Sequence, residues 1–196
     1  MLFDRIYSTG YNLHNTAEFN KRTEFDFIAR FMGEASIEAS YKMNVQDKDN
    51  RFQFIGHMEE LSTGSLNRIL EPLAGVETGG QIYGLGFNIL ANDSNATGTV
   101  DFEYDDLKIK VLRPDSDEKN VLLSVISNLT LRRSNVITDQ RFRQGRIDFE
   151  RDSQKSLFGY VWDALKDGLM DTLIPFELEK SGEGQRIRLF RKRSKS

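Results

Sequence analysis

The chain has 196 residues, of which 38% are hydrophobic and 29% are charged, and its formal net charge is −3. This balance is typical of a folded globular domain and excludes a disordered tail or a bundle of membrane helices. The chain contains no cysteine, which excludes disulfides, thiolate nucleophiles and cysteine-ligated metals. We expect no signal peptide at the first residues and no stretch of the roughly 18 to 20 apolar residues that cross a bilayer.

Strands with one apolar face are predicted over the first sixty residues. Phe3 and Tyr7 fit the start of a strand that Gly10 interrupts. Apolar residues then alternate with polar ones over 24–31, 37–45 and 52–58, which is the period of a strand with one buried face. Short connections between these segments favour an antiparallel meander.

A short helix and a second meander follow. Leucine and isoleucine side chains at helical spacing predict a helix near 62–71, with Ser62 or Thr63 as its cap and Pro72 with Gly75 at its end. Alternation resumes over 83–89, 96–104 and 107–111. The segment 92–95 and the pair at 105–106 are interpreted as turns between three strands.

The C-terminal third of the chain is predicted to be mainly helical. Periodicity indicates a helix over 121–129, a short strand over 145–150 and a clear helix over 156–174, which Pro175 ends. A last strand over 187–190 would precede a basic tail. We therefore expect a β domain at 1–112 with its helix near 62–71, a helical subdomain at 113–176 with one short strand, and the last strand and tail at 177–196.

The fold class expected from this order is mainly β, or α+β. It consists of a curved antiparallel sheet of about six or more strands, a short inserted helix and an amphipathic C-terminal helix.

Residues that would carry catalysis or bind a metal do not form a recognisable pattern. The two histidines, His14 and His57, have no metal-ligand spacing around them, and His57 is expected on the polar face of its strand. Adjacent carboxylates such as Asp105 and Asp106 point to opposite faces of a strand. The glycines near Gly79 lead into a strand and not into a helix, so a phosphate-binding loop is excluded. We expect no enzyme, no catalytic residue, no metal and no cofactor.

One apolar sheet face is the main candidate site. Aromatic side chains at alternating positions would share that face, where they would form either an ordinary core under a covering layer or an open trough that holds an acyl chain. The candidates for the trough are Phe25, Phe27, Phe31, Tyr41, Phe52, Phe54, Phe87 and Phe102.

The second candidate is a stripe on the helix over 156–174, formed by Phe158, Trp162, Leu165 and Leu169. If this stripe is exposed, the chain would be a structural or protein-interaction domain that docks through the helix.

The chain also resembles a known family. The run over 56–87 contains Leu66-Asn67 and Pro72, followed by glycines and by Leu85-Gly86-Phe87. The runs over 96–112 and 145–169 add a glycine, Tyr104-Asp105-Asp106-Leu107 and an aromatic closing helix. These features are similar to the C-terminal region of AsmA-like proteins of the Gram-negative envelope, which are related to the TamB-like lipid-transport group.

The resemblance implies a non-enzymatic module of a periplasmic, inner-membrane-anchored protein. It implies an apolar β trough that serves phospholipid transport or outer-membrane assembly, with a phospholipid, a membrane surface or other envelope proteins as partners. The chain is much shorter than such proteins, so it would correspond to their C-terminal end. The last eleven residues carry a charge of +6 and the remainder carries −9, and this acidic body argues against nucleic acid as a partner.

Overall fold

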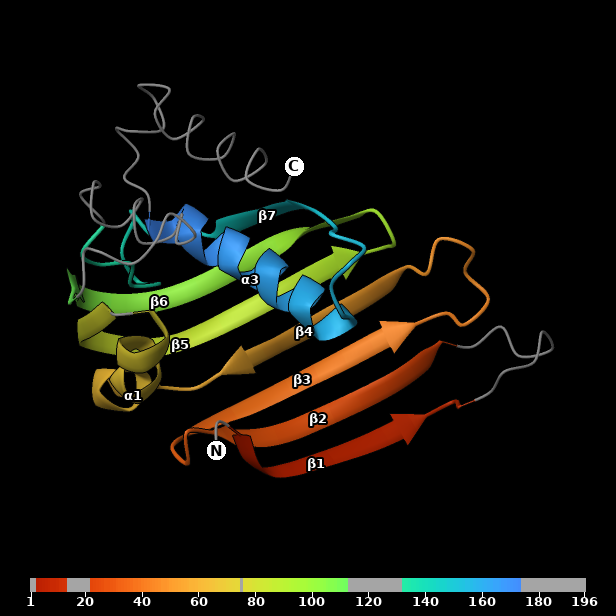
Figure 1. Cartoon of the computed structure of the whole chain (residues 1–196), viewed down its shortest axis with the longest axis horizontal. Coiled ribbons are helices and arrows are strands. Elements are labelled where there is room, and N and C mark those ends of the chain that lie inside the picture. The colour runs from red at the N-terminus through yellow and green to blue at the C-terminus, as the bar shows by residue number, and fades with distance from the viewer. Residues whose placement is uncertain (1–2, 14–21, 75, 113–131, 174–196) are drawn as a thin grey trace. The chain divides into compact units, whose positions relative to one another are not determined.

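Seven strands of the described residues form one open antiparallel sheet in the computed structural model (Figure 1). The structure describes residues 3–13, 22–74, 76–112 and 132–173. The strands follow one another across the sheet in chain order: β1 (Phe3–Tyr11), β2 (Thr23–Phe31), β3 (Ala35–Met43), β4 (Phe52–Met58), β5 (Val76–Ala91), β6 (Asn95–Val111) and β7 (Gly145–Glu150). The predicted mainly β class, with an inserted helix and a C-terminal helix, is confirmed.

The register of the strands sorts side chains onto two faces. Residues directly opposite one another in an antiparallel pair lie on the same face. Phe25 lies opposite Tyr41, Tyr41 lies opposite Phe54, and Phe54 lies opposite Ile89. We call the face that carries these residues the inner face, and the opposite side of the sheet the outer face.

The prediction of three strands in the second meander is wrong. Two long strands, β5 and β6, take their place, and β6 continues through residues 105 and 106 where a turn was expected. Asp106 has a φ of 45°, a left-handed conformation that aspartate tolerates better than most residues. Strand β6 is therefore irregular at Asp106 but continues in the same direction.

Polar partners stabilise this irregular position in β6. The Asp106 carboxylate accepts hydrogen bonds from Lys108 Nζ at 2.6 Å and from Arg133 at 2.8 Å, and these bonds hold its pKa below the usual value. Gly80 of β5 faces this stretch with a φ of 101°, and a Cβ there would lie 2.7 Å from the Asp105 carbonyl oxygen. Only glycine permits this close approach of the two backbones.

The inserted helix α1 (Thr63–Ala74) lies close to its predicted position. Ser62 caps it, because its Oγ accepts a hydrogen bond from the backbone N–H of Ser65 at 3.2 Å. Pro72, expected at the end of the helix, lies inside it. The Asn67 side chain then joins α1 to β5 by three hydrogen bonds of 2.7 to 2.8 Å with Thr78.

The C-terminal helix α3 (Leu157–Leu173) also matches its prediction closely. Ser156 caps it by accepting a hydrogen bond from the backbone N–H of Gly159 at 3.2 Å. The short strand predicted over 145–150 is β7, and it pairs with β6 as the last strand of the sheet. The predicted helix over 121–129, the last strand over 187–190 and the basic tail lie outside the described residues.

The chain divides into two compact units. The first comprises residues 1–60, 84–102 and 144–171, and it holds β1 to β4, parts of β5 and β6, β7 and nearly all of α3. The second comprises residues 61–83, 103–143 and 172–196, and it holds α1 and the remaining parts of β5 and β6. In the second unit, Asn135 is buried and forms a bridge with Tyr104 of β6.

Candidate functional site

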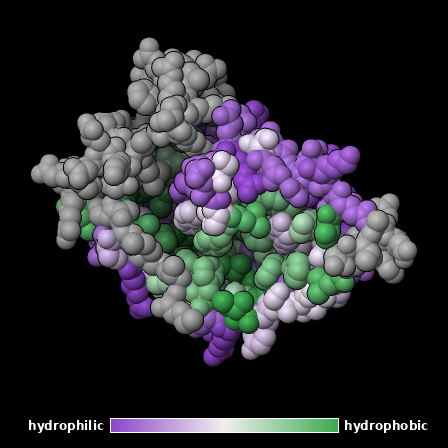
Figure 2. Space-filling view, turned by 45° about the vertical axis from the view of Figure 1, so that its right-hand side comes forward, coloured by the Kyte–Doolittle hydropathy of each residue, from purple (hydrophilic) through white to green (hydrophobic). Residues whose placement is uncertain are grey.

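The site with the most distinctive surface chemistry lies on the inner face of the first unit. We define the aromatic face as the set of six rings that β2 to β5 place there: Phe25, Phe27, Phe31, Tyr41, Phe54 and Phe87. All six side chains remain partly exposed. In space-filling view, hydrophobic side chains gather in a hollow on this side of the molecule (Figure 2).

Contacts between rings make part of the aromatic face continuous. The ring of Phe54 lies 5.1 Å from that of Phe87 and 6.4 Å from that of Tyr41, measured between centroids. On β2, the rings of Phe25 and Phe27 stack with their centroids 6.4 Å apart. Burial raises the pKa of the Tyr41 hydroxyl, because the charged form is poorly solvated there.

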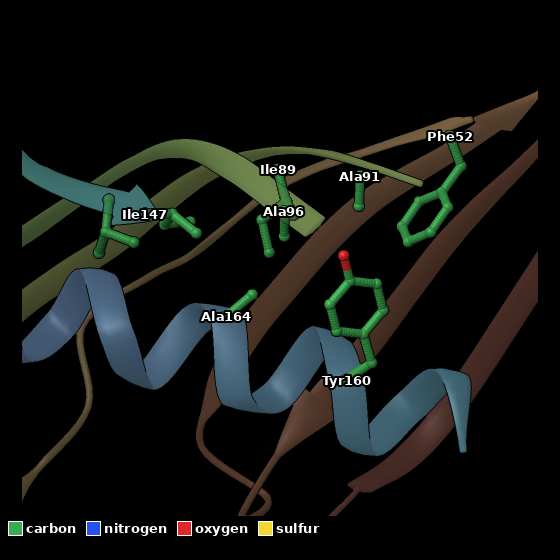
Figure 3. Close-up of a cluster of buried hydrophobic side chains, with 8 residues drawn as sticks. Phe52, Ile89, Ala91, Ala96, Ile147, Tyr160 and Ala164 are labelled. Atoms are coloured by element: carbon green, nitrogen blue, oxygen red, sulfur yellow. The ribbon is translucent and has the colours of Figure 1, made fainter. Parts of the chain in front are cut away.

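Helix α3 covers a different part of the inner face. Tyr160 and Ala164 point from the helix toward the sheet, where Phe52, Ile89 and Ala96 meet them (Figure 3). The Tyr160 ring lies 6.4 Å from the ring of Phe52 and 6.3 Å from that of Phe149, and it is only 1% exposed. Arg151 stacks on its other side, with the guanidinium 5.2 Å from the ring centroid.

Buried side chains of the sheet and of α3 form one hydrophobic cluster, and the strands that contribute to it are the ones that α3 covers. Among the described residues, this cluster draws on β4 to β7 and α3 and includes no residue of β1, β2 or β3. A helix is about 10 Å across and strands lie about 4.8 Å apart, so one helix covers roughly two to three strands of a sheet. Tyr41 and Met43 of β3 pack against the edge of the cluster, and the inner face of β1 and β2 extends beyond α3 (Figure 1).

The outer face has the opposite character. Glu24 of β2 pairs with Lys42 of β3 at 2.6 Å, and the bond to Lys42 lowers the pKa of the carboxyl. Gln53 of β4 donates a hydrogen bond to Asn88 of β5 at 2.9 Å. His57 is exposed on this face, opposite Glu38. Exposed Ile28, Ile55 and Leu90 lie among these polar residues, so the outer face is mainly but not wholly polar.

The structure separates the eight trough candidates into two groups. Phe52 is 7% exposed and belongs to the buried cluster, and Phe102 packs against that cluster. The other six form the aromatic face, where Tyr41, Phe54 and Phe87 also pack against the cluster. An ordinary core therefore explains Phe52, whereas Phe102 and the six rings of the aromatic face are partly exposed.

The predicted stripe on α3 divides into an exposed half and a packed half. Phe158 is 73% exposed and Trp162 is 50% exposed, while Leu165 and Leu169 are half-buried and pack against the buried cluster. The buried residues that α3 turns toward the sheet include Tyr160, Ala164 and Gly168, which are spaced four apart and therefore lie on one side of the helix. Periodicity did not reveal them, because alanine and glycine are a weak signal in a hydrophobic pattern.

The described part of the chain lacks two kinds of feature. No group of three or more histidine, aspartate or glutamate side chains there is arranged to hold a metal ion. None of the helices in the same ranges is both long enough and apolar enough to pass through a bilayer.

Comparisons with known proteins give no relative for this chain. A scan of family models, a search of curated proteins and a search of solved structures each found no match. The resemblance to AsmA-like proteins therefore rests on the sequence features alone.

Proposed function

We propose that this chain is a non-enzymatic lipid-binding module of the cell envelope, in which the aromatic face holds an acyl chain of a phospholipid. The partly exposed rings of the aromatic face are the observation that carries this proposal. The mainly polar outer face supports it, because the pairs Glu24–Lys42 and Gln53–Asn88 lie on the side opposite the rings. The resemblance to AsmA-like proteins favours a periplasmic location and a role in phospholipid transport or outer-membrane assembly.

The dimensions of the aromatic face suit an acyl chain. Strand β2 has nine residues, which at about 3.3 Å per residue gives a length of roughly 30 Å. The hydrocarbon core of a bilayer is about 30 Å thick, so the chains of one leaflet extend over about 15 Å. The face is thus long enough for one chain lying along the strands.

The energy of binding suits transfer between membranes better than storage. Burying a CH₂ group contributes about 0.8 kcal/mol, but an acyl chain is already buried in its membrane. A face that is open on one side covers only part of the chain. Transfer out of a membrane would therefore cost free energy, and release into an acceptor membrane would be favourable, as a transport module requires.

The test compares substitutions on opposite faces of the same strands. Phe27→Asp and Phe54→Asp place a charge on the aromatic face, while Ile28→Asp and Ile55→Asp place it on the outer face, where these side chains are 51% and 41% exposed. Native mass spectrometry of the purified chain and lipid extraction of the same sample measure bound phospholipid. Circular dichroism confirms that each variant is folded.

We expect bound phospholipid in the unmodified chain and in the two outer-face variants, and its loss in the two aromatic-face variants. A folded chain that carries no phospholipid and takes none from vesicles would refute the proposal. Equal loss in all four variants would also contradict it, because the site would then not be the aromatic face.

A protein-interaction domain is the second candidate function. The exposure of Phe158 and Trp162 favours it, since large aromatic side chains on a helix surface are common at docking sites. Trp162 is the only tryptophan of the chain, so its fluorescence reports directly on this surface. A shift of its emission to shorter wavelength with an envelope protein, together with no bound phospholipid, would favour this function over the first.

A further inference from the structure

The two edges of the sheet are treated differently by the rest of the chain. At the β7 edge, helix α3 supplies acceptors for the backbone: Asp171 accepts a hydrogen bond from the N–H of Arg146 at 2.9 Å, and Asp167 accepts one from the N–H of Asp148 at 3.0 Å. These carboxylates accept hydrogen bonds from the backbone N–H groups that an added strand would need as donors. The β7 edge is thereby closed to strand addition.

The β1 edge has no such cover among the described residues, where β1 is the first strand of the sheet order. Ile6, Tyr7 and Tyr11 are 61%, 68% and 48% exposed. The strand contains no lysine and no proline, and its only charges, Asp4 and Arg5, cancel. Sheet edges that avoid association use charge, proline or a covering element, and this strand uses none of them in its regular part.

The regular part of β1 is residues 7–11. The register with β2 is uninterrupted there, from Tyr7 opposite Ile28 to Tyr11 opposite Glu24. Before it, the pairing shifts between Asp4 and Tyr7, where Arg5 has a φ of 49°. A strand that adds to this edge would therefore pair with residues 7–11, the five residues of β1 that are in regular register.

We propose that β1 pairs with β1 of a second copy of this chain, antiparallel and about a twofold axis through Thr9. In this register Tyr7 lies opposite Tyr11 of the second copy, and the symmetry creates this pair twice. Ser8 lies opposite Gly10 on the inner face. The segment is thus complementary to itself, with aromatic pairs on one face, small residues on the other and no opposed like charges.

The interface would be somewhat smaller than average. The paired edge of five residues, about 17 Å by 10 Å, contributes roughly 170 Å² per copy. An aromatic side chain buries about 150 to 250 Å² when fully covered, so the exposed parts of Ile6, Tyr7, Tyr11 and the neighbouring Leu13 bring the total to roughly 500 Å². A standard interface buries about 800 Å² per partner. We therefore expect a dimer that dissociates on dilution.

A twofold axis perpendicular to the sheet keeps the two inner faces on the same side. The aromatic faces of both copies would then belong to one extended apolar surface. The pairing itself depends only on the β1 edge, so it is independent of whether the aromatic face binds lipid.

Cross-linking tests the register directly. The chain has no cysteine, so Thr9→Cys creates a single thiol that lies opposite its own copy. Opposed residues in an antiparallel pair have Cα atoms about 4.5 to 5.5 Å apart, which a disulfide spans. The control is Ile28→Cys, an exposed position on the next strand. We expect Thr9→Cys to form a covalent dimer under mild oxidation and Ile28→Cys to stay monomeric.

Sedimentation of chains without cysteine provides the second measurement. We expect the unmodified chain to dimerise with increasing concentration. The double variant Tyr7→Lys with Tyr11→Lys should stay monomeric, because lysines would then face each other across the axis. Leu90→Lys, at an exposed position of β5, should dimerise like the unmodified chain. A chain that is monomeric at all concentrations, or equal cross-linking at positions 9 and 28, would overturn the proposal.

Discussion

Gly168 is the position where a single methyl group most directly tests the packing of α3. A Cβ there would overlap Val100 Cγ2 and lie 2.9 Å from Ile147 Cγ1. Both neighbours are buried, Val100 at 0% and Ile147 at 3% exposure. Because neither can move away without disturbing the cluster, Gly168→Ala forces α3 away from the sheet.

The expected cost follows from two opposing effects. Alanine is favoured over glycine inside a helix by about 1 kcal/mol. Overpacking a closed core typically costs about 1 to 3 kcal/mol, occasionally more. Both contacts of the added Cβ are shorter than 3.0 Å, so we take the upper part of this range, about 2 to 3 kcal/mol. The free energy of unfolding should then fall by about 1 to 2 kcal/mol, and in a chain of this size each kcal/mol lowers the melting temperature by roughly 2 to 4 °C.

Gly159→Ala is the matched control in the same helix. Its nearest atoms are Ser156 Oγ at 3.5 Å and Lys155 Cβ at 3.6 Å, which is ordinary contact. The same substitution should therefore stabilise the chain slightly, through helix propensity alone. Urea denaturation of both variants measures the difference. If Gly168→Ala proved as stable as Gly159→Ala, α3 would not lie against Val100 and Ile147, and our account of the covered inner face would be wrong.

Three further predictions test other contacts. Asp171→Ala removes the acceptor for the N–H of Arg146 and should cost about 1 to 3 kcal/mol, with faster amide hydrogen exchange at residue 146; unchanged exchange would contradict the closed β7 edge. Asn67→Ala removes three hydrogen bonds to Thr78 and should also cost about 1 to 3 kcal/mol in urea denaturation. Burial raises the pKa of Tyr160 from 10.0 to about 12, so its contribution to stability is complete below pH 10 and is lost as the pH rises toward 12. Tyr160→Phe should therefore lose less stability over that range than the unmodified chain.

Alternation predicted the sheet well because burial on one face of a strand leaves a simple signal. The aromatic residues of β2, β3 and β4 lie on the expected face. The turn expected at Asp105 and Asp106 was wrong for a physical reason. Aspartate favours turns and left-handed backbone alike, and here hydrogen bonds from nearby Lys108 and from distant Arg133 hold Asp106 within a continuous strand. The sequence around Asp106 does not show that Arg133 comes close to it.

Helix α3 shows why the covering of a face is harder to predict than the face itself. Of the predicted hydrophobic stripe, Leu165 and Leu169 pack against the buried cluster and Trp162 is exposed, whereas the periodicity missed the buried residues Tyr160, Ala164 and Gly168. The small residues Ala164 and Gly168 let the helix approach the sheet closely. The need for small residues at these positions becomes visible only in the folded structure, where the two surfaces are in contact. Likewise, Asp167 and Asp171 look like ordinary surface charges in the sequence, although they close the β7 edge.

The two parts of the inner face differ in a way that supports a binding role for the open part. Under α3, the rings of Phe52 and Phe149 meet the Tyr160 ring of the helix, and small residues such as Ala96 and Ala164 fill the same closed core. On the aromatic face, the rings of Phe25 and Phe27 stack on each other, and neither belongs to the buried cluster or packs against it among the described residues. Such a surface fits no single covering shape closely. It suits a flexible apolar ligand, which adjusts its own conformation to the rings, and an acyl chain is the simplest ligand of that kind.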